Sequence, residues 1–215
     1  EEVDPAEGEE VDAALQEVSR LSRLVDGLLA LARAERTSTT VTAEAVDLRD
    51  LLGERREVWA AVAAEQGVDL VLDTGAVPVV ALATPDHVAG VIDNLLANAL
   101  DVSHPGRSVT LSCRAGGAHV EVHVVDQGPG MTAEARARAF DRFWTTPSRG
   151  PRLGGSGLGL PIARRLARID GGDLELAEAP AGGIDAVLTL QAAPRRSTPG
   201  SRGPSPGDAP AAAVR

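Results

Sequence analysis

The sequence predicts an α+β fold, a two-layer sandwich of helices on one face of a mixed, mostly antiparallel sheet, preceded by one amphipathic helix. Helical and strand patterns interleave along residues 47–191, but most of the strand patterns are neighbours that can form hairpins, which argues against a doubly wound parallel sheet. With 43% hydrophobic and 24% charged residues among 215, the chain can build one buried core with extensions.

The amphipathic helix is predicted over residues 11–34, within a first segment of residues 1–35. Apolar residues recur there at spacings of three and four, which places them on one face of a helix. Additional leucines make this face wider than a two-stranded coiled-coil seam, so the helix needs a partner, either its own domain or other helices. Residues 36–46 are rich in Thr, Ser and Ala without a period and are predicted to be a linker.

The predicted globular block comprises residues 47–191. Asp47 is placed to cap a helix over residues 48–65, and Pro85 opens a second helix that runs to Val102. A hairpin is predicted about Gly116-Gly117, from alternating runs at residues 109–114 and 119–125. The remaining predicted elements are strands at 68–72, 78–82, 173–177 and 186–191 and helices at 133–143 and 157–169. Residues 192–215, rich in proline and arginine, are predicted to form a disordered tail.

Composition excludes several functional classes. The 21 basic and 31 acidic residues give a net charge of −10, which argues against binding to nucleic acid or anionic membranes. Every basic residue is Arg, so neither a P-loop lysine nor a lysine Schiff base is available. The single Cys113 excludes an intrachain disulfide and a cysteine-based zinc cluster. No apolar run approaches the roughly 20 residues of a membrane helix, so we expect no membrane contact.

Two asparagines four residues apart, Asn94 and Asn98, lie on one face of an otherwise apolar helical pattern. The neutral oxygen of an amide can bind a hard divalent cation such as Mg²⁺ without fixing the charge of the site. Alternatively, both amides bind nearby backbone groups of their own helix. The pattern leaves these two interpretations open.

Two glycine-rich segments add candidate ligand contacts. Asp126, at the end of a strand and followed by Gly128 and Gly130, can accept a hydrogen bond from an exocyclic amine, although ordinary turns share this pattern. A second cluster directly precedes an arginine-rich helix, and its backbone amides can form an anion cradle; the alternative is a flexible loop with a helix cap. Its residues are Gly155, Ser156, Gly157, Leu158 and Gly159.

The order and spacing of these motifs are more specific than any one of them. Asn94-Leu-Leu-Ala-Asn98, Asp126-Gln-Gly-Pro-Gly130, Phe140-Asp-Arg-Phe143 and the Gly-Ser-Gly-Leu-Gly cluster resemble the four boxes of the catalytic, ATP-binding domain of sensor histidine kinases. The resemblance covers about residues 47–191. The upstream run from Arg20 to Arg33 looks like the second helix of the family's dimerisation and phosphotransfer bundle.

The resemblance implies a fold shared with gyrase, Hsp90 and MutL proteins, and ATP and Mg²⁺ as ligands. Asn98 then holds the Mg²⁺ ion and Asp126 accepts from the adenine amine. The glycines at 128 and 130 shape the adenine pocket, those at 155, 157 and 159 let the backbone approach the phosphates, and Phe140 and Phe143 anchor the near end of a lid over residues 144–154. The implied function is transfer of the γ-phosphoryl group of Mg-ATP to a histidine on an upstream helix, and then to the receiver domain of a response regulator. A homodimer through residues 11–34 and a cytoplasmic location are implied as well.

Several positions depart from the family. ATP-hydrolysing relatives carry a Glu as general base where this chain has Asn94, so hydrolysis is disfavoured. The phosphoacceptor signature is absent, and we expect structural or solvent-facing roles for the histidines at 87, 104, 119 and 123. Asp101 and Thr145 stand where the family often has Lys and Arg. These two residues motivate the alternative of a non-catalytic nucleotide-binding or dimerisation module, although Arg149 and Arg152 could compensate for them.

Overall fold

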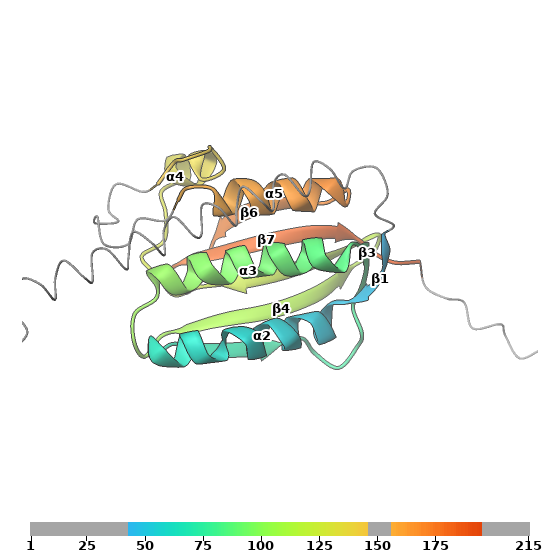
Figure 1. Ribbon diagram of the computed structural model, residues 1–215, viewed down its shortest axis with the longest axis horizontal. Helices are drawn as coiled ribbons and strands as arrows, with labels where there is room; N and C mark the ends of the chain where they lie inside the picture. Colours follow the sequence, from blue (N-terminus) through green and yellow to red (C-terminus); the bar gives the residue numbers. More distant parts are fainter. Residues whose placement is uncertain (1–42, 146–155, 195–215) are drawn as a thin grey trace, which may run out of the picture.

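The computed structural model describes residues 43–145 and 156–194, which form two layers, with helices on one face of a sheet (Figure 1). This arrangement confirms the predicted α+β class. The elements are β1 (Glu44–Asp47), α2 (Leu48–Glu65), β2 (Asp69–Asp73), β3 (Val80–Ala83), α3 (Pro85–Val102), β4 (Ser108–Gly116), β5 (His119–Val125), α4 (Ala133–Arg138), α5 (Gly159–Ile169), β6 (Asp173–Glu178) and β7 (Ile184–Gln191). Among the described residues, no helix combines the length and the apolar character that crossing a membrane requires.

The main sheet has five strands in the order β2-β4-β5-β7-β6. β2 runs parallel to β4, and the other three pairs are antiparallel. A separate antiparallel pair, β1 with β3, is connected to the end of β7 through a bridge between Ala81 and Ala192. The parallel β2–β4 pair follows from α3, which lies between these strands in the sequence and brings the chain back across the sheet face.

The core lies between the sheet and α2, α3 and α5. Buried and half-buried residues alternate along β5 and β7, as expected for strands with one covered face. α3 contributes the largest helical share, with Val88, Val91, Ile92, Leu95, Leu96 and Leu100 all buried. Burying each of these side chains stabilises the fold by about 1.5–3 kcal/mol. The core therefore holds the α3 backbone at a fixed position over the sheet.

Local signals predicted α2 and α3 with the correct bounds. The Asp47 side chain accepts a hydrogen bond from the Arg49 backbone N–H (2.9 Å), as a helix cap should, and Pro85 occupies the first turn of α3. The predicted hairpin is also confirmed, with β4 and β5 joined through Gly117 at a φ of 76°.

Two predictions are wrong. The predicted linker 36–46 includes part of a strand, β1, which has a single buried residue, Val46, and so lacks a visible period. The helix predicted over 133–143 ends at Arg138, and Phe143 adopts a positive φ of 64°, which no right-handed helix permits. The predicted helix 11–34, residues 146–154 of the predicted lid and the predicted tail from residue 195 lie outside the described residues.

Candidate functional site

The two asparagines of α3 meet the first residue of α5. A Cβ atom placed on Gly159 would lie 3.1 Å from Asn94 Oδ1 and 3.5 Å from Asn98 Nδ2. A side chain at this position would crowd the Asn94 amide and contact the Asn98 amide, so glycine permits the close approach. The structure thus brings the predicted asparagine pair and the second glycine cluster together.

Both amide nitrogens bind their own helix. Asn94 Nδ2 donates to Gly90 O at 2.7 Å, and Asn98 Nδ2 donates to Asn94 O at 2.8 Å. These are the local backbone bonds that the sequence left as an alternative. They are compatible with ligand binding, because an amide whose N–H donates still has its carbonyl oxygen as an acceptor, now held in one orientation.

The N-terminus of α5 has no side-chain cap: Leu158 occupies the N-cap position and makes no capping hydrogen bond. The Leu158 N–H donates to Ser156 Oγ at 3.3 Å, which orders the approach to the helix. The first backbone N–H groups of a helix lack intrahelical partners and carry partial positive charge. This end of α5 is therefore suited to an anion, next to Asn94 and Asn98.

Asp126 is buried at the end of β5. Its Oδ1 accepts from the backbone N–H of Gly128 (2.8 Å) and from that of Ile184 (3.2 Å). A Cβ atom on Gly128 would lie 2.8 Å from Val102 Cγ2 and 3.0 Å from Asp126 Oδ1. A side chain at this position would force Val102 or the Asp126 carboxylate to shift, so glycine permits their close packing.

Sequence reasoning missed Gly183. It has a φ of 89°, and a Cβ atom there would lie 2.7 Å from Asp126 Oδ1. Gly130, across from it, would place a Cβ atom 3.5 Å from the Gly183 carbonyl oxygen. The backbone at Gly183 thus packs directly against Asp126, and the backbone at Gly130 packs against Gly183. The Gly182-Gly183 pair in the turn between two predicted strands was the available signal.

Phe143 and Gly157 join the two described segments. The Phe143 N–H donates to Gly157 O at 3.0 Å, and a Cβ atom on Gly157 would lie 2.6 Å from the Phe143 carbonyl carbon. We call residues 140–145 together with 156–158 the stem. The two phenylalanines differ within it: Phe140 packs against the core, whereas Phe143 is 69% exposed and participates through its backbone.

The four histidines have the structural or exposed positions that the sequence predicted. His87 Nδ1 lies 3.1 Å from Asp170 Oδ1, and His123 Nδ1 lies 3.0 Å from Asp185 Oδ2. The residues at 104 and 119 are exposed.

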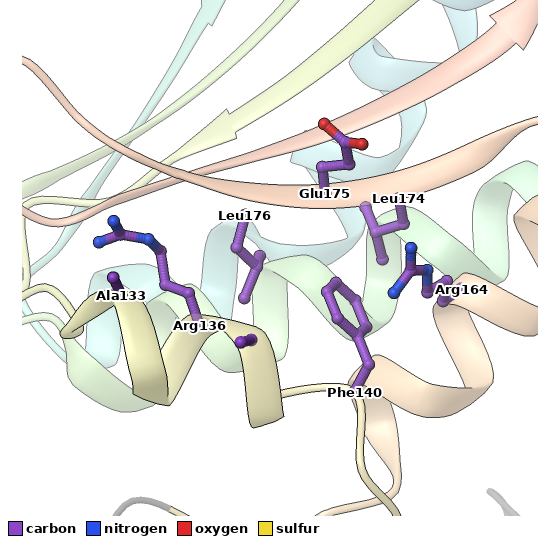
Figure 2. Close-up of a pocket in the computed structure, with 8 residues that line it drawn as sticks. Ala133, Arg136, Phe140, Arg164, Leu174, Glu175 and Leu176 are labelled. Carbon is purple, nitrogen blue, oxygen red and sulfur yellow. The ribbon is translucent and has the colours of Figure 1, made fainter.

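A separate surface pocket of about 330 Å³ opens between α4, α5 and β6 (Figure 2). It is lined by Ala133, Arg136, Ala137, Phe140, Arg164, Leu174, Glu175 and Leu176. Phe140 is a predicted site residue, whereas Asn94, Asn98 and Asp126 lie elsewhere. The pocket therefore adjoins the stem and is distinct from the α3–α5 junction.

Comparison with known proteins gives the family of the chain. Residues 83–194 match the family model described as "Histidine kinase-, DNA gyrase B-, and HSP90-like ATPase". The chain is 36% identical over 180 residues to a probable sensor histidine kinase HK of Mycobacterium tuberculosis, a match that covers 83% of this chain and 45% of that protein. It is 33% identical over 190 residues to the sensor histidine kinase MtrB of the same species, covering 88% of this chain and 33% of MtrB.

Among solved structures, full-length ShkA in complex with AMPPNP superposes with a TM-score of 0.71 at 26% identity, covering 90% of this chain and 40% of ShkA. The chain spans less than half the length of these relatives. The matched family segment contains both asparagines, Asp126 and all of α5. On these grounds the chain belongs to the family of histidine kinase-, DNA gyrase B- and HSP90-like ATPases, and its relatives within that family are sensor histidine kinases.

Proposed function

We propose that this chain is the ATP-binding catalytic part of a two-component sensor histidine kinase, and that it binds Mg-ATP where α3 meets the N-terminus of α5. The observation that carries the proposal is the convergence of Asn94, Asn98 and the uncapped helix end at Gly159. Amide oxygens suit a hard cation, and helix N–H groups suit phosphates. Few other ligands need both within one site.

The residues present fit the two parts of this ligand. Asn98 would hold Mg²⁺ through its amide oxygen, with Asn94 beside it. Asp126 is held by two backbone N–H groups, as a fixed acceptor for the adenine amine must be, and Gly128, Gly130 and Gly183 let the backbone pack closely around it. Bound Mg-ATP would supply the γ-phosphoryl group and neutralise its charge.

Asn94 bears on which group accepts the phosphoryl group. An amide cannot accept a proton from water or from serine, so this site favours a nucleophile that is activated elsewhere. We place the acceptor histidine on an upstream helix, because none of the histidines in this sequence stands in a phosphoacceptor signature. In a second step, the phosphoryl group would be transferred from this histidine to an aspartate of a response regulator receiver domain.

Calorimetry of the full chain with Mg-ATP tests the site. Asp126→Asn should weaken affinity by about tenfold to a hundredfold, the loss expected for one charge-assisted hydrogen bond. Asp73→Asn is the matched control, because that residue is exposed on the edge strand β2 and belongs to none of the elements that form the site. Absence of binding at millimolar ATP, or equal affinity in Asp126→Asn, would overturn the proposal.

We also propose that residues 11–34 form a bundle helix that dimerises the chain. Residues 1–35 contain three Arg and ten acidic residues, a net charge of 3 − 10 = −7, so repulsion should weaken the dimer at low salt. Sedimentation of the full chain should show a dimer that salt strengthens, and a variant lacking residues 1–42 should be monomeric. If both are monomers at every salt concentration, the bundle-helix assignment fails.

Asp101 and Thr145 favour one second candidate, a non-catalytic nucleotide-binding or dimerisation module. The two functions differ in whether the chain phosphorylates a separately supplied phosphoacceptor bundle. We expect the bundle to be phosphorylated when Mg-ATP is added. If the chain binds nucleotide but does not phosphorylate the bundle, the second candidate is established.

A further inference from the structure

Arg164, in the middle of α5, is held by β6. Its Nε and Nη2 donate to the two carboxylate oxygens of Asp173, at 2.8 and 3.1 Å. The same carboxylate accepts from Arg168 and from the Leu174 backbone N–H. A planar guanidinium bound through two nitrogens has a fixed plane as well as a fixed position.

The face of this guanidinium covers the Phe140 ring. Arg164 Cζ lies 4.5 Å from the ring centroid, and Figure 2 shows the two side chains next to each other at the pocket wall. A cation over an aromatic face is attracted by the negative face of the ring. Because the guanidinium bonds Asp173 through its edge, its face is available to the ring, an arrangement that a lysine ammonium cannot reproduce.

Phe140 packs against the core on one side and lines the pocket on another, so the Arg164 contact covers a ring that protein encloses only in part. Phe140 lines a cavity of about 330 Å³, so part of its surface has no protein packed against it. Phe140 is also the first residue of the stem, three residues before the bond from Phe143 to Gly157. Holding the ring therefore holds the stem against the N-terminus of α5.

We propose that Arg164 is a positioning residue: through its stack on Phe140 it fixes the stem, and through the stem it keeps the N-terminus of α5 in place for the nucleotide. The effect of Arg164 on the affinity for Mg-ATP rests on the proposed function. The contacts themselves link β6, α5 and the stem whether or not a nucleotide binds. Neither Arg164 nor Asp173 belongs to the motifs that identified the site.

Trp144 provides a readout that needs no nucleotide. The chain has two tryptophans and no tyrosine, so Trp59→Phe leaves Trp144, in the stem, as the reporter. In this background Arg164→Met should raise the acrylamide quenching constant of Trp144 by about twofold or more, because a released stem exposes the indole. Arg165→Met, an exposed position on the same helix, is the matched control. Arg168→Met removes a second arginine from Asp173 and should have a smaller effect.

Calorimetry of the same variants with Mg-ATP measures the consequence. Arg164→Met should weaken affinity by about three- to tenfold, the range that a cation–π contact can supply. Phe140→Leu should reproduce this loss, and the double variant should be no weaker than the worse single variant, because both remove one contact. A merely structural role for Arg164 would instead give additive losses.

Two results overturn the proposal: quenching in Arg164→Met equal to that in Arg165→Met, or additive losses in the double variant. Arg164→Lys, which keeps the charge, replaces Arg164→Met if the latter does not fold, and it should show most of the same increase in quenching. If the wild-type chain fails to bind Mg-ATP, the proposed function falls, and the quenching comparison still decides whether Arg164 positions the stem.

Discussion

Polar side chains lie at both ends of the contact between α3 and α5, but they form hydrogen bonds between elements at one end and within α3 at the other. At one end, Asp170 accepts from the Thr84 N–H (3.1 Å) and the Thr84 hydroxyl (3.0 Å), and His87 Nδ1 lies 3.1 Å away. At the other end, Asn94 and Asn98 donate to their own helix, and α5 contributes only a glycine. We call these the closed end and the open end.

The difference separates stability from function. At the closed end polar groups of two elements satisfy each other, so the helices are joined there and no acceptor is needed from outside. At the open end hydrogen bonds run along one helix, so they orient the amides without joining α3 to α5. A site that holds a ligand between two helices needs this arrangement, and the closed end keeps the pair aligned.

The largest expected effect is on the closed end. Asp170→Ala should reduce the free energy of unfolding by about 3–5 kcal/mol, because the change leaves buried donors without their acceptor. Urea denaturation measures this loss, with Asp73→Ala, at an exposed position on β2, as the control. Without denaturant, where the variant is still folded, Mg-ATP affinity should fall by less than about tenfold, because the apolar core still holds both helices. A loss under 1 kcal/mol would mean that the closed end does not join the helices.

The open end should respond in the opposite way. Asn98→Ala should lower Mg-ATP affinity by more than about tenfold, because a cation ligand is lost. The same variant should lower the free energy of unfolding by less than about 1 kcal/mol, since the Asn98 amide donates one partly buried hydrogen bond to its own helix. Calorimetry and urea denaturation test the two parts. Equal losses of stability in Asn98→Ala and Asp170→Ala would remove the distinction between the ends.

Asp173 provides an exposed counterpart to the buried Asp170. Hydrogen bonds from Arg164, then from Arg168 and the Leu174 N–H, hold the pKa of this carboxyl below its ordinary value of 3.8. A group whose folded pKa is lowered stabilises the fold above its ordinary pKa, and this contribution disappears as pH falls through the folded pKa. Since the side chain is 39% exposed, we expect only about 1 kcal/mol.

Asp173→Asn should therefore be less stable than wild type by about 1 kcal/mol at pH 7, and the difference should shrink as pH falls below 4. Urea denaturation at pH 7, 4 and 2.5 measures it. A difference that stays constant with pH would mean that the carboxylate acts through packing rather than charge.

The smallest effect is expected at Cys113. Burial on β4, aided by the negative charge of Asp47 and opposed by Arg49, raises the pKa of this thiol to about 11. The thiol should be neutral and protected at pH 8, so disulfide reagents should label it only after the fold opens. Asp170→Ala should accelerate labelling, and Asn98→Ala should leave it unchanged. Fast labelling of the wild type would show that β4 opens independently of the helices.

What the sequence determined by itself lies within short spans of chain. Asp47 and Pro85 predicted the start of α2 and α3, Gly117 allowed the β4–β5 turn, and the spacing of Asn94 and Asn98 placed them on one face of a helix. Each of these depends on residues within about four positions, where local sterics and hydrogen bonds decide the conformation.

What only the tertiary structure decided involves residues far apart in the chain. Asp126 meets Ile184 across 58 positions, and Asp170 meets His87 across 83. The end of α4 was predicted wrongly for the same reason: the Phe143 backbone turns to meet Gly157, and no residue near Phe143 signals that contact. Pairings of this kind are formed by the packing of the sheet and helices, so the sequence indicated which groups would take part, and the fold determined which partners they met.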